Sequence, residues 1–437
     1  MLKQYDIHNR FKSSIDDFQQ MDPHLHALSQ LKYQYSPQWW STLSLTTPGV
    51  YILTGGRQVG KSTSCKLLIN ACVKNRNFLP QNTLYLPCDE IYDAKTLSET
   101  IRFFISNCQE GLFLLVVDEV TFVKHWDRVI KALADEGLFR RGLCLLTGSD
   151  TLILKEAAMR FPGRRGNAAQ TDFHVYPLSF SEYAHLRFLD DVERNDNLEQ
   201  LFQEYLHCGG YLRAINDLAE YGEVTQATYS IYEQWIRGDF LRQGKHEETL
   251  VAVVQALLTI GVSQISYSKL TQKIGLISKE TCIDYCRLLE RMGILIDLQA
   301  FDQNKQQGFP RKDRKFHFTD PFVQRTLVQW LVSRGVLSSS MIVESHLVEA
   351  CVASHCYRWG RVFYFKGEGE IDVILLQNQQ SYAVEVKWSN QLRPHDLKLL
   401  KSFKHAIILT KTPVAGSIEG VKCVPVYDFL ATRSLKG

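Results

Sequence analysis

The stretch Gly55-Gly56-Arg57-Gln58-Val59-Gly60-Lys61-Ser62 decides the fold that we expect for the first part of this chain. It matches the pattern G-x-x-x-x-G-K-[ST], follows an apolar run at 50–53 and precedes a helical pattern at 63–74. Glycines let backbone N–H groups curl around phosphate oxygens, the lysine supplies a cation for the β and γ phosphates, and the serine offers a hydroxyl to Mg²⁺. The alternative is a glycine turn that only precedes a helix.

Short apolar runs alternate with helical patterns on both sides of this loop, between residue 49 and about residue 181. We expect strands at 50–53, 83–86, 113–117 and 143–146, and helices that include 62–74 and 94–107. Such alternation is typical of a parallel sheet with crossover helices, so the expected fold class is α/β. The strand at 83–86 fits between the phosphate-binding loop and the acidic motif that follows it.

Two acids end the strand predicted at 113–117. At the carboxyl end of a parallel strand, Asp118 can hold Mg²⁺ through water and Glu119 can polarise the water that attacks a phosphate. Two such acids can also be merely solvated, but beside a phosphate-binding loop the catalytic interpretation is favoured. The residues that we expect to bind nucleotide are Gly55, Gly56, Arg57, Gln58, Val59, Gly60, Lys61, Ser62, Thr63, Asp118 and Thr147.

Further polar groups follow along the chain. The strand predicted at 143–146 ends in Thr147 and, two residues later, Ser149, whose hydroxyls we expect beside the γ-phosphate. For Ser149 a helix cap is the alternative. Arg164 and Arg165 lie on a glycine-containing loop, where a guanidinium group can stabilise transferring phosphate in the same or a neighbouring subunit, or else be solvated.

Length and composition exclude several classes of protein. The chain has 437 residues, which at about 150 residues per domain predicts roughly three domains. With 45% hydrophobic and 22% charged residues, it is not largely disordered, collagenous or a coiled coil. Apolar stretches fall short of the roughly 20 residues of a membrane helix, and the charges at 1–18 do not suit a signal peptide. We therefore expect a cytoplasmic protein without a membrane partner.

Cysteine content and net charge are uninformative about a partner. Eleven scattered cysteines, an odd number, favour reduced core thiols over disulfides. Cys282 and Cys286 are four residues apart on an expected helix, where packing is favoured over zinc binding. The net charge of +3 does not imply nucleic acid by itself, so any basic surface must be local.

A helix-turn-helix pattern begins at residue 265. Apolar positions mark a first helix, Gly275 marks a turn, and Ser278 caps a second helix. Strands at 294–298 and 315–318 would add an antiparallel wing, and the segment 303–315 between them holds five cations and one acid. Such a charge suits DNA phosphates, and packing or protein binding is the alternative. The cations are Lys305, Arg311, Lys312, Arg314 and Lys315.

Two predicted strands near the C-terminus, 370–376 and 381–387, carry charged residues among apolar ones. Alternation places Glu385 and Lys387 on one face, with Asp372 on the opposite strand. Charges in such strands are costly unless they are used, so the carboxylates can hold Mg²⁺ while Lys387 positions or activates water for phosphodiester hydrolysis. Glu344 or Glu349, on a helix expected at 341–359, can add a further acid.

The chain carries six motifs in the order 55–62, 113–119, 145–149, 161–164, 176–183 and 208–212. Together they resemble prokaryotic AAA-type ATPases that carry a C-terminal nuclease-like region. The resemblance covers about residues 45–410, and its most specific elements are P-L-S-F-x-E-[FY] and L-P-G-R. Phe161 replaces the leucine of L-P-G-R, and Leu212 replaces the proline of the G-G-x-P element.

The C-terminal pattern of helix, strands and helix resembles the PD-(D/E)XK nuclease fold. Asp372, Glu385 and Lys387 fall on its signature, and Glu344 falls on its helical acid. This resemblance implies Mg²⁺-dependent cleavage of DNA. A degenerate module that only binds DNA or protein is the alternative.

These patterns and resemblances predict five parts: an N-terminal lead-in at 1–48, a P-loop AAA-type ATPase domain at 49–185, a helical connector at 186–262, a winged-helix domain at 263–337 and an α/β PD-(D/E)XK-like domain at 338–437. The expected function is ATP hydrolysis with Mg²⁺ coupled to DNA engagement and cleavage. The alternative is a nucleotide-switched regulatory or scaffold ATPase with a non-cleaving module, and a homo-oligomer or protein partner fits either. The expected catalytic residues are Glu119, Arg164, Asp372, Glu385 and Lys387, and the expected metal ligands are Ser62, Asp118, Glu344, Asp372 and Glu385.

Overall fold

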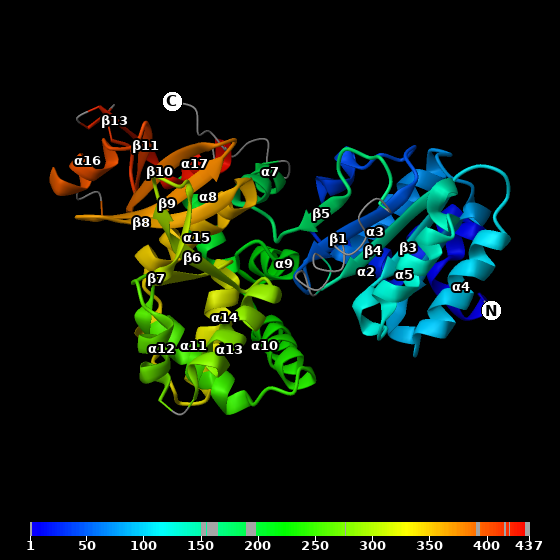
Figure 1. Ribbon diagram of the computed structural model, residues 1–437, viewed down its shortest axis with the longest axis horizontal. Coiled ribbons are helices and arrows are strands. Elements are labelled where there is room, and N and C mark those ends of the chain that lie inside the picture. The colour runs from blue at the N-terminus through cyan, green and yellow to red at the C-terminus, as the bar shows by residue number, and fades with distance from the viewer. Residues whose placement is uncertain are drawn as a thin grey trace. The chain divides into compact units, whose positions relative to one another are not determined.

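The computed structural model describes residues 2–149, 154, 165–188, 198–275, 277–389, 394–414, 417–418 and 420–432. These residues form two compact units, Met1–Tyr176 and Pro177–Gly437 (Figure 1). Each unit has its own sheet, of five strands in the first and eight strands in the second.

The first unit is built on a parallel sheet with the strand order β2-β3-β4-β1-β5. The first four strands lie where the sequence predicts them, and their residues are buried throughout, as in a sheet covered on both faces. The α/β class with a parallel sheet is thereby confirmed. The strands are β1 Gly49–Gly55, β2 Thr83–Pro87, β3 Phe113–Asp118, β4 Gly142–Gly148 and β5 Asp172–Val175.

The spatial order of the strands differs from their order along the chain. β2 follows the phosphate-binding loop and precedes the acidic motif in the sequence, as expected, but in the sheet it lies outside β3, and β4 lies between β1 and β3. β4 therefore carries Thr147 between the ends of the two motif-bearing strands. β5, which the sequence did not predict, pairs with β1 on its other side.

Helices cover both faces of this sheet. α3 begins at Lys61, directly after the phosphate-binding loop, and α4 is capped by Asp93, whose side chain accepts a hydrogen bond from the Thr96 N–H. The helices are η1 Lys3–His8, η2 Arg10–Lys12, α1 Ile15–Met21, α2 Pro23–Ser29, η3 Gln38–Thr42, α3 Lys61–Lys74, η4 Pro80–Asn82, η5 Cys88–Glu90, α4 Ala94–Ser106, η6 Val120–Phe122, α5 Trp126–Asp135 and η7 Leu138–Arg141.

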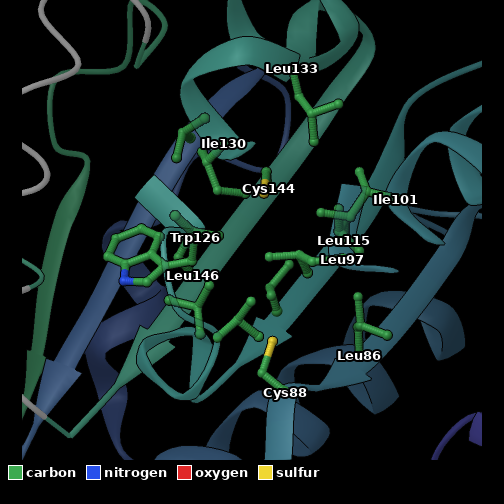
Figure 2. Close-up of a cluster of buried hydrophobic side chains, with 14 of the residues drawn as sticks. Leu86, Cys88, Leu97, Ile101, Leu115, Trp126, Ile130, Leu133, Cys144 and Leu146 are labelled. Carbon is green, nitrogen blue, oxygen red and sulfur yellow. The ribbon is translucent and has the colours of Figure 1, made fainter. Parts of the chain in front are cut away.

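One apolar core joins α4 and α5 to the sheet. Figure 2 shows Leu97 and Ile101 of α4 and Ile130 of α5 facing side chains of the strands, among them Leu115 and Leu146. These side chains are fully buried. Their burial fixes β3 and β4 side by side, which holds the polar residues at the strand ends in register.

The N-terminal segment is tied to this unit by a buried ion pair. Lys66 of α3 and Asp22 are both fully buried, with the lysine Nζ 2.6 Å from the Asp22 Oδ2. The other Asp22 oxygen caps α2 by accepting from the N–H groups of His24 and Leu25. Because each charge is buried with its partner, the helix α3 and the segment before β1 depend on each other.

The second unit begins with helices. Leu212, which replaces the expected proline, is the first residue of α9, where proline is also common. The helices are α7 Phe180–Phe188, α8 Leu198–Cys208, α9 Leu212–Tyr221, α10 Gln226–Arg242, α11 Glu247–Ile260, α12 Tyr267–Ile274, α13 Lys279–Arg291, α14 Pro321–Ser333, η8 Ser339–Met341, α15 Glu344–Trp359, α16 Pro394–Leu400 and α17 Val426–Thr432.

The sheet of the second unit has the order β12-β13-β11-β10-β9-β8-β6-β7. The hairpin of β6 and β7 joins it through Ala300 of β6, which pairs in parallel with Tyr364 of β8. The sheet therefore runs across the boundary expected at residue 337. The strands are β6 Leu295–Asp302, β7 Gln307–Phe318, β8 Arg361–Lys366, β9 Glu370–Gln377, β10 Gln380–Lys387, β11 His405–Thr410, β12 Ser417–Ile418 and β13 Val421–Pro425.

The fold agrees with the expectation for the cysteines. All eleven cysteines are unpaired, and all except Cys108 are buried, so they are core thiols as expected. Each helix in the described part of the chain is too short or too polar to cross a bilayer.

We predict that Asp22→Asn destabilises the first unit by about 3–5 kcal/mol, because it leaves the Lys66 ammonium buried without its counter-charge while keeping an acceptor for the α2 cap. Urea denaturation of the full chain, followed by hydrogen exchange in peptides of β1 to β4, measures the change. Lys95→Ala is the control, since Lys95 forms an exposed pair with Glu99. Equal stability of the two variants would contradict the prediction.

Candidate functional site

The phosphate-binding loop connects the end of β1 to the first turn of α3. Gly55 has a φ of 154°, and a Cβ there would lie 2.5 Å from the carbonyl oxygen of Val175 on β5, so only glycine fits. Gly60 has a φ of 88° and faces open space. The loop thus presents an open cradle of backbone at the N-terminus of a 14-residue helix.

Lys61 extends back along this loop. Its ammonium donates to the carbonyl oxygens of Gly55 and Gly56, at 3.1 and 2.9 Å, and lies 3.4 Å from the Glu119 Oε1. The cation is therefore held at the mouth of the loop, between the backbone that would surround phosphate and the second acid of the acidic motif.

Asp118, at the end of β3, is 6% exposed and accepts hydrogen bonds from three hydroxyl groups. Ser62 and Tyr85 donate to its Oδ2 at 2.6 and 2.5 Å, and Thr147 donates to its Oδ1 at 2.5 Å. Burial and the adjacent carboxylate raise the pKa of Tyr85, so its hydroxyl stays protonated and remains a donor. Neutral hydroxyls from three elements compensate the buried charge.

Glu119 sits just beyond β3 in the left-handed backbone region, with a φ of 51° and a ψ of 44°. Such a conformation is costly for a residue with a Cβ and is concentrated at functional sites. The Glu119 N–H donates to the Thr147 Oγ1 at 2.9 Å, and its Oε2 accepts from the N–H and hydroxyl of Ser149 at 3.0 and 3.1 Å. Thr147 and Ser149 therefore position both acids.

These residues fit a phosphate group with Mg²⁺. The Ser62 hydroxyl and the Asp118 carboxylate form the all-oxygen donor set that Mg²⁺ prefers, beside the open cradle at Gly60. The Ser62 hydroxyl is neutral and can rotate its proton away from the carboxylate to present a lone pair. The structure thus brings together Lys61, Ser62, Asp118, Glu119 and Thr147 as the sequence predicted.

Other predicted residues of this loop have different surroundings. The Arg57 guanidinium lies 5.9 Å from the ring centre of Phe122, and Gln58 adopts a positive φ of 61°. Val59 packs against the core beneath α3. Thr63 lies in the first turn of α3 and is partly buried.

The expected arginine loop is described only at its end. Arg164 and residues 161–163 lie outside the described residues, so the role of Arg164 stays a prediction. Arg165 has a structural role. Its Nη1 and Nη2 donate to the two Asp172 oxygens at 2.7 and 3.0 Å, and its Nη2 also donates to the Thr171 carbonyl.

In the second unit the three signature residues come together. The Val386 N–H donates to the Asp372 Oδ2 at 3.0 Å, and the Asp372 N–H lies 3.4 Å from the Glu385 Oε2. The Lys387 ammonium lies 2.6 Å from the Glu385 Oε1. β9 and β10 therefore place Asp372, Glu385 and Lys387 as one group.

A second lysine, Lys315 of β7, occupies the acidic side of this group. Its Nζ lies 2.8 Å from the Glu349 Oε1, 2.6 Å from the Glu370 Oε1 and 3.2 Å from the Asp372 Oδ1. Burial, with Asp372 close by, raises the pKa of Glu349, and the Lys315 ammonium opposes this rise. Burial alone would lower the pKa of Lys315, but these carboxyl groups raise it, so the lysine stays charged.

The predicted helical acid is also different. Glu344 accepts from the Trp388 Nε1 at 2.8 Å and lies 3.7 Å from the Lys411 Nζ. Glu349, more than one turn further along α15, is the acid that shares a cation with Asp372. The expected role of Glu344 as a metal ligand beside Asp372 is therefore corrected to Glu349 as an ion-pair partner.

The residues around Asp372 do not fit a divalent metal. Each Asp372 oxygen faces a nitrogen donor, Lys315 on one side and Val386 on the other, and an ammonium cannot ligate a metal. Within the described residues, no three His, Cys, Asp or Glu side chains are grouped as a metal site. The Mg²⁺ expected at Asp372 and Glu385 is thus at odds with the lysine placed among the acids.

The basic segment of the hairpin contains both exposed cations and cations that are held in contacts within the protein. It is a strand rather than a loop, because β7 begins at Gln307. Arg314 is partly buried and donates to the Asp297 Oδ2 at 2.7 Å, and Lys315 is buried. The exposed cations near the hairpin tip are Lys305, Arg311 and Lys312, and Phe309 is exposed beside them.

Sequence reasoning missed Tyr85, Glu370 and the role of Lys315. Tyr85 is a polar-tipped residue in an otherwise apolar strand, which was the available signal. Lys315 directly precedes Phe316, His317 and Phe318, and all four are buried, so the buried end of β7 includes the last residue of the segment expected as a loop.

Three known families match successive parts of the chain. Residues 47–184 match the AAA domain family. Residues 199–333 match a domain of unknown function, DUF8612, and residues 341–429 match another, DUF4143.

Full-length relatives are distant. An uncharacterized protein of Haemophilus influenzae is 22% identical over 88% of this chain and 94% of its own length, and one of Methanocaldococcus jannaschii is 25% identical over 84% and 82%. A Walker-type ATPase of Pyrococcus abyssi has a TM-score of 0.43 at 15% identity, covering 64% of this chain and 90% of that one. The ORC1 protein of Aeropyrum pernix, solved in complex with DNA, has a TM-score of 0.35 at 11% identity, with 77% and 94% covered. The match over residues 47–184, together with the loop and acids described above, makes this part of the chain an AAA-type P-loop ATPase domain.

Proposed function

We propose that the protein hydrolyses ATP with Mg²⁺ in its first unit and contacts DNA through the β6–β7 hairpin of its second unit. The observation that carries the first part is the convergence of Lys61, Ser62, Asp118 and Glu119 around Thr147. Such an arrangement suits phosphate hydrolysis, whereas folding alone would not require so many polar groups at one place.

Each residue has a distinct task in this proposal. Bound Mg²⁺ would neutralise charge on the β and γ phosphates. Ser62 and Asp118 hold that ion, and Lys61 moves from the loop carbonyls to phosphate oxygens. Glu119, kept in place by Thr147 and Ser149, orients water toward the γ-phosphate. Arg164 stays the proposed group that stabilises the transferred phosphate, in the same chain or in a neighbouring copy.

Contact with DNA rests on the hairpin tip. Lys305, Arg311 and Lys312 are exposed, and the Lys312 ammonium lies 5.3 Å from the ring centre of the exposed Phe309. Cations beside an exposed aromatic ring suit phosphates and bases.

A regulatory or scaffold function is the second candidate. The exposed residues of α13, the second helix of the helix-turn-helix pattern, are Lys279, Glu280, Asp284 and Arg287, whose charges cancel. A helix that enters a DNA groove usually carries net positive charge, so a neutral surface favours a protein partner there. We do not propose DNA cleavage by Asp372, Glu385 and Lys387, because the Lys315 ammonium lies 3.2 Å from the Asp372 Oδ1.

We predict that Glu119→Gln retains ATP binding and loses turnover by about a hundredfold or more, since the amide cannot accept a proton or polarise water. Lys61→Ala should instead weaken ATP binding, because the lysine contacts ground-state phosphate. ATP binding and phosphate release are measured on the full chain, with the exposed Glu110→Gln as control. Equal turnover in Glu119→Gln and Glu110→Gln would defeat the assignment.

Thr147→Val should slow ATP turnover by about tenfold to a hundredfold with ATP affinity nearly unchanged, because the hydroxyl positions both acids. Thr147→Ser keeps the hydroxyl and should stay close to wild type. If both variants lose the same activity, the packing of the whole threonine side chain rather than its hydroxyl alone is responsible.

Neutralising Lys305, Arg311 and Lys312 to glutamine should weaken binding of duplex DNA and reduce its salt dependence, by about 0.9 in log–log slope for each phosphate that the hairpin no longer neutralises. The matched control replaces Lys398, Lys404 and Lys422, exposed lysines of the same unit. Fluorescence anisotropy at several salt concentrations gives the slopes. An unchanged slope in the hairpin variant would contradict DNA contact through the hairpin and would favour the scaffold function.

A further inference from the structure

Lys315 lies on β7, the last strand in the order of the eight-stranded sheet, and its side chain is almost fully buried. It is 1% exposed, and its neighbour on the same face of the strand, His317, is fully enclosed. Burial lowers the pKa of His317 to about 3, so the imidazole is neutral and adds no second cation. The positive charge of Lys315 therefore compensates the acids around it.

The geometry matches three donors to three acceptors. A lysine ammonium carries three N–H groups, and three carboxyl oxygens lie around the Lys315 Nζ, from Glu349, Glu370 and Asp372, at 2.6 to 3.2 Å. The acids come from α15 and β9, whereas the lysine comes from β7. One ammonium thus joins three elements.

The position of this ammonium is where a metal-dependent site would hold its ion. Asp372 lies at the centre of the predicted nuclease-like signature, beside Glu385 and Lys387. A divalent ion there needs lone pairs from Asp372 and Glu385, and the Lys315 ammonium already donates to the Asp372 Oδ1. The two cations compete for one place.

We propose that the Lys315 ammonium is the permanent counter-ion of Glu349, Glu370 and Asp372 in place of a divalent metal, and that this cluster clasps the β6–β7 hairpin onto the C-terminal sheet without serving cleavage.

The clasp explains how the hairpin is attached. Backbone pairing between β6 and β8 occurs at Ala300 with Tyr364, which is little for two strands of a sheet. Side chains add to it: the Tyr364 hydroxyl donates to the Asp313 carbonyl at 2.5 Å, and Gln264 donates to the Glu370 carboxylate. Lys315 contributes the charged part of this attachment. The proposal goes beyond the proposed ATPase and DNA contact and does not depend on either.

The test compares thermal unfolding of full-length variants in EDTA and in Mn²⁺. All carry Asp118→Ala, so that the nucleotide site adds no metal effect. In EDTA, Lys315→Ala should lower the unfolding temperature of the second unit by roughly 6–12 °C, because it leaves buried acids without a counter-charge. Mn²⁺ should restore much of this loss, since the shorter side chain vacates the place of the ammonium.

Two controls separate charge from space. Lys315→Met should lose stability like Lys315→Ala but gain nothing from Mn²⁺, because the methionine fills the room. Lys366→Ala removes a half-exposed cation 3.8 Å from the same Glu370 and should change little. The parent with intact Lys315 should unfold at the same temperature in EDTA and in Mn²⁺.

Three results would overturn the proposal. They are a Lys315→Ala variant as stable as its parent in EDTA, a Lys315→Ala variant that Mn²⁺ does not stabilise, and a parent whose unfolding temperature rises in Mn²⁺ and no longer does so after Asp372→Asn. Should Lys315→Ala fail to fold, the parent with and without Asp372→Asn decides the matter alone.

Discussion

Charge buried at a sheet must be compensated, and each unit of this protein is arranged around such a compensation. Asp118 is enclosed at the end of β3, and Lys315 is enclosed within β7. An uncompensated charge at either place would cost several kcal/mol, which is comparable with the net stability of a domain. The groups that compensate each buried charge determine what each site can bind.

The two compensations differ in kind. Asp118 is surrounded by hydroxyl groups of Ser62, Tyr85 and Thr147, which are neutral and whose protons can rotate. A cation can replace one of these hydrogen bonds without leaving any charge unanswered. At Asp372 the partner is the ammonium of Lys315, which carries its charge permanently and has no lone pair. The first site is therefore open to metal chemistry, and the second is occupied by the protein itself.

How much the sequence predicts follows from the range of the interactions. The phosphate-binding loop is local in sequence, so Gly55 to Ser62 predict strand, loop and helix directly, and Asp118 with Glu119 follows from the end of an apolar strand. Asp372, Glu385 and Lys387 lie on two strands joined by a tight turn, and their grouping was predictable for the same reason.

The remaining features depend on long-range register. The proposed exclusion of metal by Lys315 depends on the packing of β7 against β9 and α15, where Lys315 contacts Glu349 and Asp372, 34 and 57 residues further along the chain. The choice of Glu349 over Glu344 depends on how α15 is rotated, and both fit its sequence pattern. Tyr85 reaches Asp118 only because β2 pairs with β3 on the side away from β4.

The central claim is that, of the two sites considered in the described part of the chain, the one at Asp118 binds a divalent metal and the one at Asp372 does not. The most direct measurement is a count of bound Mn²⁺ by electron paramagnetic resonance, with a non-hydrolysable ATP analogue present. We expect one Mn²⁺ per chain, lost in Asp118→Ala. Two ions per chain, one of them retained in Asp118→Ala and lost in Asp372→Ala, would contradict the account.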